Sequence, residues 1–377
     1  MSAPVKVLVC GTRFGEHYLA ALAGGTLPGY RLAGILARGS QRSRALAERL
    51  GVALYQSVEQ LPADIQVACV VVRSAIVGGD GSNIARALLE RGIHVLQEHP
   101  AHPTDIARLQ AVGHAHGCRY QVCTFYPHLP AGRRLIGYAR ASAERRAPAF
   151  VEITTSLQLL YSSLDLVQRA LGGPAASFSC SAAPLPEGPP MPFRALQGRF
   201  GTVPFALHLQ DWLDPNDPDH HSLVMHRIAI GGPEGHVTLV NSYGPVVWSH
   251  PIYAPDYQRD DAAASYLLAP EAHADCRFNR QPTAVTFGPG DGPSLAQAVH
   301  SDFPQAIGAA LDELLDPTAA VHQPAWWQAH GQAWLGIMRA VGQPREVHCL
   351  PPPVPWPDPL HYAQVQHAQA QAQESHR

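Results

Sequence analysis

Two residues that can donate protons follow neighbouring strand-like runs of the chain. His99 comes shortly after the run at 93–96, and Tyr126 comes after a run near 119–124. Histidine has an unperturbed pKa near neutrality, and the higher pKa of tyrosine keeps its phenol protonated. If both runs belong to one parallel sheet, their carboxyl ends meet at the edge where such sheets bind ligands. The pair therefore predicts proton transfer; a turn histidine and an ordinary core tyrosine are the alternatives.

Lysine chemistry is nearly absent from the chain. Of its 27 basic residues, all but Lys6 are arginines, which are effectively always protonated and therefore poor proton donors or nucleophiles. Lys6 itself begins an apolar run, which argues against Schiff-base chemistry and lysine acid catalysis. A Walker-type phosphate loop, which requires a lysine in G-x-x-x-x-G-K-[ST], is absent for the same reason.

The elements that would position the two donors follow an alternating pattern. Short β-branched runs at 5–10, 30–37, 65–73, 93–96 and 119–124 are separated by helical patterns, which predicts a parallel, doubly wound α/β sheet over residues 1–125. Several strands among Pro/Gly loops then predict a second α+β domain over 126–345, with a mainly antiparallel sheet closed by helices at 295–315 and 326–341. The Pro-rich and Gln/Ala-rich tail over 346–377 is predicted to be weakly ordered.

The first strand ends in a glycine-containing turn, Gly11-Thr12-Arg13-Phe14-Gly15, that opens a helix. Dinucleotide-binding folds place G-x-G-x-x-G there, so that backbone N–H groups at the helix N-terminus meet the pyrophosphate. Arg13 replaces the second glycine and one spacer residue is missing, so an ordinary turn is the alternative. The position inside the first βαβ unit favours a cofactor turn, and Arg13 can add charge beside phosphates.

The end of the second strand indicates which dinucleotide is bound. NAD-preferring domains carry Asp or Glu there, whereas this chain has Ala-Arg-Gly-Ser-Gln-Arg-Ser over 37–43. Arg38, Ser40, Arg42 and Ser43 can bind a 2′-phosphate, which favours NADPH over NADH; a solvated basic helix start is the alternative. The further candidates for cofactor contacts are Ser74 and Glu98, of which Glu98 is expected to orient the backbone or a ribose.

The fourth strand region carries a family resemblance. Residues 83–100 are similar to the A-L-x-x-G-x-H-V-x-x-E-K-P segment of the Gfo/Idh/MocA oxidoreductases, whose lysine lies beside nicotinamide and substrate. In this chain His99 occupies the lysine position. Three features together resemble the thiazolinyl imine reductases of siderophore biosynthesis. They are this substitution, the shortened turn at 11–15 and the stretch Cys-Thr-Phe-Tyr-Pro-His over 123–128. The resemblance covers about residues 5–343.

The resemblance implies a Rossmann domain followed by a substrate domain, and hydride transfer from NADPH to a thiazoline C=N carbon. The ring nitrogen must then gain a proton, for which the resemblance implies His99 and Tyr126 without settling which one acts. His128 and Asp165 are the expected pocket residues. Sugar dehydrogenases of the wider family have a histidine where this chain has Ser162, so sugar oxidation becomes the less favoured function.

Other functions remain open at this point. A Gfo-type sugar or amine dehydrogenase and a non-catalytic NADP(H)-sensing regulator are the alternatives. The favoured function implies a nonribosomal peptide synthetase carrier protein as the partner that bears the thiazoline, and the family analogy implies a homodimer through the second sheet.

The composition excludes several other classes. The chain is 46% hydrophobic, has a net charge of −3, and contains no apolar run near the ~20 residues of a membrane helix. We therefore expect a soluble, cytoplasmic protein that binds neither nucleic acid nor membrane. Seven scattered cysteines indicate reduced thiols. The residues His114, His116, Cys118 and Cys123 lack the spacing of a zinc site. The acidic stretch over 211–221 contains Pro215 and Pro218 and is expected to be a polar loop, so no metal is expected.

Overall fold

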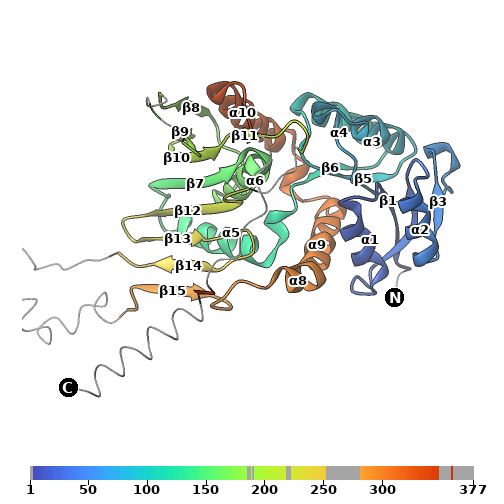
Figure 1. Ribbon diagram of the computed structural model, residues 1–377, viewed down its shortest axis with the longest axis horizontal. Coiled ribbons are helices and arrows are strands. Elements are labelled where there is room, and N and C mark those ends of the chain that lie inside the picture. Colours follow the sequence, from blue (N-terminus) through green and yellow to red (C-terminus); the bar gives the residue numbers. More distant parts are fainter. Residues whose placement is uncertain are drawn as a thin grey trace, which may run out of the picture.

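The computed structural model describes residues 3–184, 188, 191–217, 222–251, 281–347 and 358–359. The predicted tail over 346–377 lies almost wholly outside the described residues. Within them, residues 5–123 and residues 150–287 build separate sheets, which lie side by side with helices packed on each (Figure 1).

The first sheet, called sheet A, is six-stranded in the described part of the chain, with all its pairs parallel and the order β3-β2-β1-β4-β5-β6. Its strands are β1 (Val5–Cys10), β2 (Tyr30–Leu36), β3 (Ala53–Tyr55), β4 (Val67–Val70), β5 (His94–Glu98) and β6 (Tyr120–Cys123). This order reverses direction at β1 and confirms the predicted doubly wound sheet. The carboxyl ends of β5 and β6 are neighbours, as the argument for His99 and Tyr126 requires.

Alternate residues of β1 enter different cores because successive strand side chains point to opposite faces. Val7 and Val9 pack with α1 and α2, whereas Leu8 and Cys10 belong to the core that includes α3 and α4. The helices are α1 (Gly15–Ala23), α2 (Gln41–Leu50), α3 (Gly81–Glu90) and α4 (Pro103–Ala115). Both faces of sheet A are thus covered, which explains its nearly continuous apolar strands.

The second sheet, called sheet B, is eight-stranded in the described residues, with the order β15-β14-β13-β12-β7-β10-β9-β8. Its strands are β7 (Phe150–Ser156), β8 (Phe178–Ala182), β9 (Arg194–Phe200), β10 (Val203–Gln210), β12 (His226–Gly232), β13 (Gly235–Leu239), β14 (Val246–Ser249) and β15 (Ala284–Phe287). Only the β7–β10 pair in this sheet is parallel, which confirms the mainly antiparallel prediction. The short strands β11 (Trp212–Leu213) and β16 (Arg345–Glu346) pair separately.

Helices cover one face of sheet B. They are α5 (Pro130–Ala143), α6 (Leu160–Ala170) and α10 (Pro324–Val341), which pack on β13, on β7 and β12, and on β8, respectively. Sequence patterns indicated α6 and α10 but not α5. On the opposite face of the sheet, the side chains of Glu152, His208 and Arg227 are exposed.

One helical segment departs from the prediction that residues 295–315 close the second sheet. It forms α8 (Leu295–Gln297), a π-helical turn at Ala298–Asp302, and α9 (Phe303–Leu315), and α9 packs against α1 of the first half (Figure 1). The reason lies in sheet A, where Cys69, Leu96 and Cys123 of β4, β5 and β6 share a core with Ile307 and Leu311. Helix α9 therefore covers the part of this face that α1 and α2 leave open.

No helix in the described residues is long and apolar enough to span a bilayer.

Candidate active site

His99 lies just beyond the carboxyl end of β5, with one ring nitrogen held by two oxygen atoms. Nδ1 is 2.9 Å from Oε1 of Glu98 and 3.0 Å from the carbonyl oxygen of Cys123 on the neighbouring strand β6. Because a carbonyl oxygen only accepts, Nδ1 carries a proton and donates it. Nε2 has no hydrogen-bond partner among the described residues, and the side chain keeps 11% exposure. Nε2 is therefore the atom that can exchange a proton with a bound molecule.

Glu98 sets the charge of His99. Its other oxygen, Oε2, accepts a hydrogen bond from the hydroxyl of Tyr18 on α1 at 2.6 Å. Burial by itself lowers the pKa of His99, but the hydrogen bond and charge of Glu98, together with the Cys123 carbonyl and the charge of Asp165, raise that pKa above its ordinary value. The imidazolium form is thus favoured. Protein groups engage the Glu98 carboxylate, which differs from the expectation that it orients the backbone or a ribose.

Tyr126 enters the site through a tight turn after β6. Its N–H donates to the carbonyl oxygen of Thr124 at 2.7 Å, and Phe125 between them has φ 63° and ψ −58°. This is a γ-turn in a sparsely populated region, and such conformations cost about 1–3 kcal/mol. The buried ring of Phe125 packs edge-on against Tyr126 with a centroid separation of 5.6 Å.

The hydroxyl of Tyr126 is a proton donor at neutral pH. Burial raises the pKa of Tyr126 far above its ordinary value, and the charge of Glu98 adds to this effect. Among the described residues the hydroxyl makes no hydrogen bond, so its proton is available to a ligand. The structure thus places two proton donors, His99 and Tyr126, at the carboxyl edge formed by β5 and β6.

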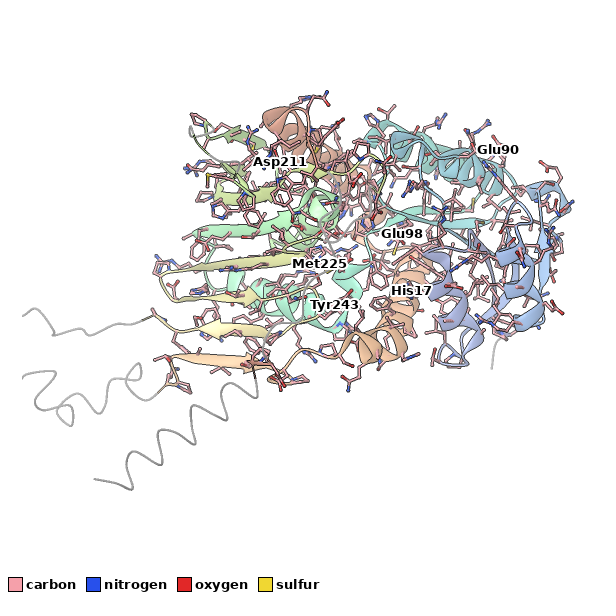
Figure 2. The ribbon with its side chains drawn as sticks, in the orientation of Figure 1. His17, Glu90, Glu98, Asp211, Met225 and Tyr243 are labelled. Atoms are coloured by element: carbon pink, nitrogen blue, oxygen red, sulfur yellow. The ribbon has the colours of Figure 1, made fainter. Side chains whose placement is uncertain are left out.

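Sheet B and its helices complete the surroundings of both donors with residues that sequence reasoning missed. Tyr161 of α6 stacks on His99 with a centroid distance of 5.8 Å, and His226 of β12 lies 4.2 Å from the ring of Tyr126. Figure 2 shows Glu98 on the sheet A side, and Met225 and Tyr243 on the sheet B side. The one signal for His226 was its place at the start of an apolar strand pattern.

Asp165, expected in the substrate pocket, is instead fully buried and bound to protein groups. It accepts hydrogen bonds from Thr124 Oγ1 at 2.6 Å, from Arg169 Nε at 3.0 Å and from Trp326 Nε1 at 3.3 Å. Burial would raise the pKa of Asp165, but Arg169 and the other donors lower it on balance. A buried carboxylate needs such partners, and here they join the end of β6 to α6 and α10.

His128, the other expected pocket residue, belongs to the same buried network. Its Nε2 lies 3.5 Å from Oε2 of Glu313. The Glu313 carboxylate also accepts two hydrogen bonds from Arg169, from Nη1 to Oε1 at 2.6 Å and from Nη2 to Oε2 at 3.0 Å. Burial lowers the pKa of His128 to about 4 despite the nearby carboxylate. The structure places both His128 and Asp165 among groups that hold α6 and α9 together.

The turn after β1 fits a dinucleotide pyrophosphate. Gly11 has φ 95°, and a Cβ there would lie 2.4 Å from the carbonyl oxygen of Val71, so only glycine fits. The amides of residues 12–15 make no hydrogen bond within the described residues, and Phe14 gives α1 no side-chain cap. These open N–H groups at a helix N-terminus are the donors a phosphate needs, with the exposed side chain of Arg13 nearby.

The predicted 2′-phosphate residues are not equally available. The Ser40 hydroxyl caps α2 by accepting from the Ser43 N–H at 3.2 Å, and Ser43 is buried. Arg42 donates to the Thr12 carbonyl at 2.9 Å and pairs with Glu16 at 2.5 Å. The 37–43 stretch has no carboxylate of its own, but the fold places the Glu16 carboxylate beside it. Arg38 is exposed and has no partner among the described residues.

Ser74 links the end of β4 to the segment after His99. Its hydroxyl donates to the carbonyl oxygen of Pro100 at 2.5 Å, and the residue is 1% exposed. This contact occupies the side chain that was expected to bind the cofactor. Ser74 therefore supports the backbone beside His99.

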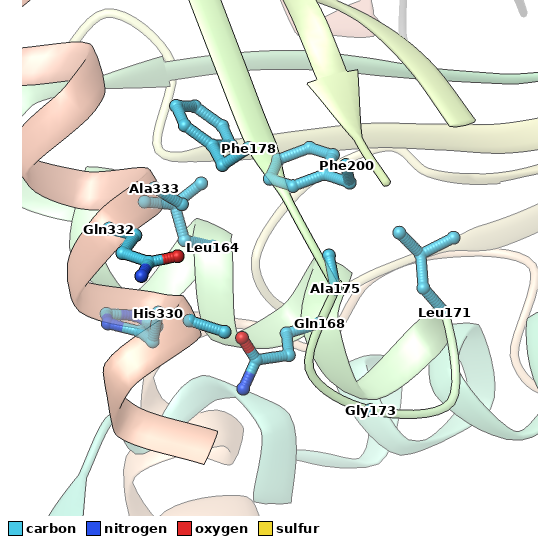
Figure 3. Close-up of a pocket in the computed structure, with 11 residues that line it drawn as sticks. Leu164, Gln168, Leu171, Gly173, Ala175, Phe178, Phe200, His330, Gln332 and Ala333 are labelled. Atoms are coloured by element: carbon cyan, nitrogen blue, oxygen red, sulfur yellow. The ribbon is translucent and has the colours of Figure 1, made fainter. Parts of the chain in front are cut away.

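A small cavity lies apart from these residues, between α6, α10 and the strands β8 and β9 (Figure 3). Its lining is mainly apolar, and none of the predicted site residues contributes to it. His330 at its edge has Nε2 2.9 Å from the Tyr161 carbonyl, whereas its Nδ1 is buried without a partner. We assign no ligand to this cavity.

Family models match two separate parts of the chain. The model "Oxidoreductase family, NAD-binding Rossmann fold" (GFO_IDH_MocA) matches residues 5–124, and "Thiazolinyl imine reductase Irp3-like, C-terminal" matches residues 146–249. A search of curated proteins found no match.

Solved structures share the fold at low sequence identity. GenD2 from gentamicin A biosynthesis, in complex with NAD, has 16% identity and a TM-score of 0.62 over 90% of this chain and 95% of its own. UDP-N-acetylglucosamine 3-dehydrogenase GnnA from Acidithiobacillus ferrooxidans has 13% identity and a TM-score of 0.60 over 91% of this chain and 100% of its own. A putative NADPH-dependent oxidoreductase from Desulfitobacterium hafniense has 13% identity and a TM-score of 0.60 over 89% of this chain and 96% of its own.

These identities show the shared fold alone, whereas the two family models together cover more than half of the chain. The parallel sheet with its open phosphate turn agrees with the first model, and the mainly antiparallel sheet coincides with the second. The chain is therefore a nicotinamide-dependent oxidoreductase of the Gfo/Idh/MocA family, with a second domain of the thiazolinyl imine reductase type.

Proposed function

We propose that this protein is an NADPH-dependent thiazolinyl imine reductase, which reduces the C=N bond of a thiazoline to a thiazolidine. The observation that carries the proposal is the pair of proton donors, His99 and Tyr126, at the carboxyl edge of β5 and β6. The match of residues 146–249 to the thiazolinyl imine reductase model supports the substrate class.

Imine reduction needs a hydride at carbon and a proton at nitrogen. NADPH, when bound, supplies the hydride. The nitrogen must gain its proton before or during this transfer, since an uncompensated amide anion would be high in energy. His99 can donate from Nε2 as an imidazolium, and Tyr126 can donate from its hydroxyl; the proposal holds with either as the donor.

The charge state of the site favours reduction over alcohol oxidation. A sugar dehydrogenase must remove a proton from a hydroxyl group, which requires a base. Here the Glu98 carboxylate raises the pKa of His99, and burial raises the pKa of Tyr126, so both shifts favour the protonated, donor forms over the bases that alcohol oxidation needs. Two donors at the reacting edge also favour catalysis over a purely regulatory NADP(H) sensor.

The choice of NADPH rests on Arg38. This exposed guanidinium follows β2, where a dinucleotide fold places the adenine ribose, and it has no partner in the described part of the chain. The residues over 37–43 include no carboxylate, and Arg42 neutralises Glu16 through their ion pair. A 2′-phosphate would therefore meet net positive charge.

The substrate we propose is carried as a thioester on a carrier protein of a nonribosomal peptide synthetase, in siderophore biosynthesis. We further propose a cytoplasmic homodimer, formed through the face of sheet B opposite α5, α6 and α10. Light scattering at several protein concentrations tests the dimer, which a mass of one chain throughout would contradict.

The function is tested by NADPH oxidation with a soluble thiazoline thioester analogue. We expect loss of NADPH absorbance with the thiazoline and a product heavier by two hydrogen atoms, with a smaller rate for NADH. A protein that leaves the thiazoline unchanged but oxidises a sugar or amine with NADP⁺ would contradict the proposal. Cofactor binding without turnover of any of these substrates would favour the regulator.

A further inference from the structure

His226 is a buried histidine held at both ring nitrogens by serines from different elements. It begins β12 and has no solvent exposure. Nε2 lies 2.8 Å from the hydroxyl of Ser162 on α6, and Nδ1 lies 2.8 Å from the hydroxyl of Ser242 between β13 and β14. Two anchors at opposite edges of a flat ring fix both its position and its rotation.

These contacts define the tautomer. The Ser162 hydroxyl also lies 3.0 Å from the carbonyl oxygen of Leu159, which can only accept, so the single hydroxyl proton goes there. Ser162 must then accept from the Nε2–H of His226, and the bare Nδ1 accepts from Ser242. Burial and the charge of His99 lower the pKa of His226 to about 3, so the ring stays neutral.

The face of the His226 ring contacts Tyr126. The two ring centroids are 4.2 Å apart with an interplanar angle of 48°. Phe125, fixed by the γ-turn, packs against Tyr126 with an interplanar angle of 87°. The phenol is therefore confined by two rings. Because both nitrogens of His226 are engaged, this residue has no group left for a substrate or a proton.

We propose that His226, held by Ser162 and Ser242, is a positioning residue that orients the Tyr126 hydroxyl toward the reacting nitrogen. This inference deepens the proposed function and rests on it for its catalytic consequence. Correct orientation matters because a displacement of about 1 Å at a reacting group can cost on the order of 10²-fold in rate. Phenylalanine could fill the same space, but it could neither donate to Ser162 nor accept from Ser242, so the ring would lose both anchors.

The test is a double-mutant cycle between the two rings. His226→Asn should lower kcat about tenfold or more, with the Kd of NADPH unchanged, because cofactor contacts are not involved. In a Tyr126→Phe background the same change should cost less than about twofold, since the hydroxyl being oriented is gone. An equal fold-loss in both backgrounds would show a general structural role and overturn the proposal.

Two further variants, Ser242→Ala and His236→Asn, allow the proposal to be tested even if His226→Asn folds poorly. Ser242→Ala removes one anchor and should lower kcat in the same Tyr126-dependent way. His236→Asn is the matched control, because His236 lies on the neighbouring strand β13 and contacts Phe150 rather than Tyr126. A kcat loss for His236→Asn equal to that for His226→Asn would contradict the assignment.

A readout without turnover separates this inference from the proposed function. With ¹³Cζ-labelled tyrosine, the Tyr126 resonance is identified by its absence in Tyr126→Phe. That resonance should shift in His226→Asn and Ser242→Ala but not in His236→Asn. If the wild type fails to reduce a thiazoline and the resonance still shifts in Ser242→Ala, which keeps the His226 ring, the proposed function fails while the positioning of Tyr126 stands. An unchanged resonance in Ser242→Ala overturns the inference.

Discussion

The Glu98 carboxylate lies 2.9 Å from Nδ1 of His99, so the last residue of β5 raises the pKa of the residue that follows it in the chain. Tyr18 fixes the carboxylate by a 2.6 Å hydrogen bond from α1. Since Nδ1 is held by Glu98 and the Cys123 carbonyl, the proton that can be transferred is the one on Nε2.

The first prediction concerns the pH dependence of turnover. If His99 is the donor, kcat should fall as pH rises through its pKa, which Glu98 raises above the ordinary value near 6.5. Glu98→Gln removes the negative charge and so lowers this pKa, which should move the descending limb of kcat to lower pH. Turnover measured between pH 5.5 and 9 checks this, with the exposed Glu90→Gln on α3 as control. An unmoved limb would exclude His99 as the titrating donor.

A second prediction separates the two donors. Tyr126→Phe and His99→Gln should each lower kcat more than they change the Kd of NADPH, and the loss at the true donor should be ~10²–10⁴-fold. The residue with the smaller effect then binds or orients the imine. Single-turnover rates and NADPH fluorescence titrations give the two quantities. Full activity in both variants would refute the site.

Arg38 carries the prediction for cofactor preference. A charge-assisted contact contributes about 1.5–3 kcal/mol, so Arg38→Ala should raise the KM for NADPH about tenfold to a hundredfold and leave that for NADH nearly unchanged. Arg42→Ala should cost less, because Arg42 is already paired with Glu16 and bound to the Thr12 carbonyl. The ratio of kcat/KM for the two cofactors measures this. A larger loss from Arg42 would reverse the assignment.

The fold could be predicted because its pattern is local. Alternating strands and helices determine a parallel sheet, and the apolar runs at β1 and β4 need two covered faces. The packing of α9 on sheet A could not be read in the same way. The apolar stripe of α9 could pack on any exposed apolar face. Only the three-dimensional arrangement shows that α1 and α2 leave the face formed by β4, β5 and β6 uncovered.

The residues of the site likewise fall into those that the sequence predicts correctly and those whose surroundings only the structure shows. His99 and Tyr126 were predicted because they follow neighbouring parallel strands, which places them at one edge from connectivity alone. Asp165 and His128 were expected in the pocket, yet the structure buries both against Arg169 and Glu313. A charged residue near a site in sequence can belong to the pocket or to its support, and only its partners distinguish the two.

The last prediction concerns the buried network that joins the two halves. Arg169 bonds Asp165 at 3.0 Å and Glu313 at 2.6 Å, and its guanidinium lies 5.4 Å from the ring centroid of Trp326. Arg169→Met keeps the length and the apolar contact but leaves two carboxylates without their cation. Removing one partner of a buried pair costs about 3–5 kcal/mol, so the free energy of unfolding in urea should fall by that order. Arg86→Met is the matched control, because Arg86 pairs with Glu90 on the exposed side of α3 at 3.3 Å, and such pairs contribute about 0.3–0.5 kcal/mol. Equal losses in the two variants would mean that the Arg169 network contributes no more to stability than a surface ion pair.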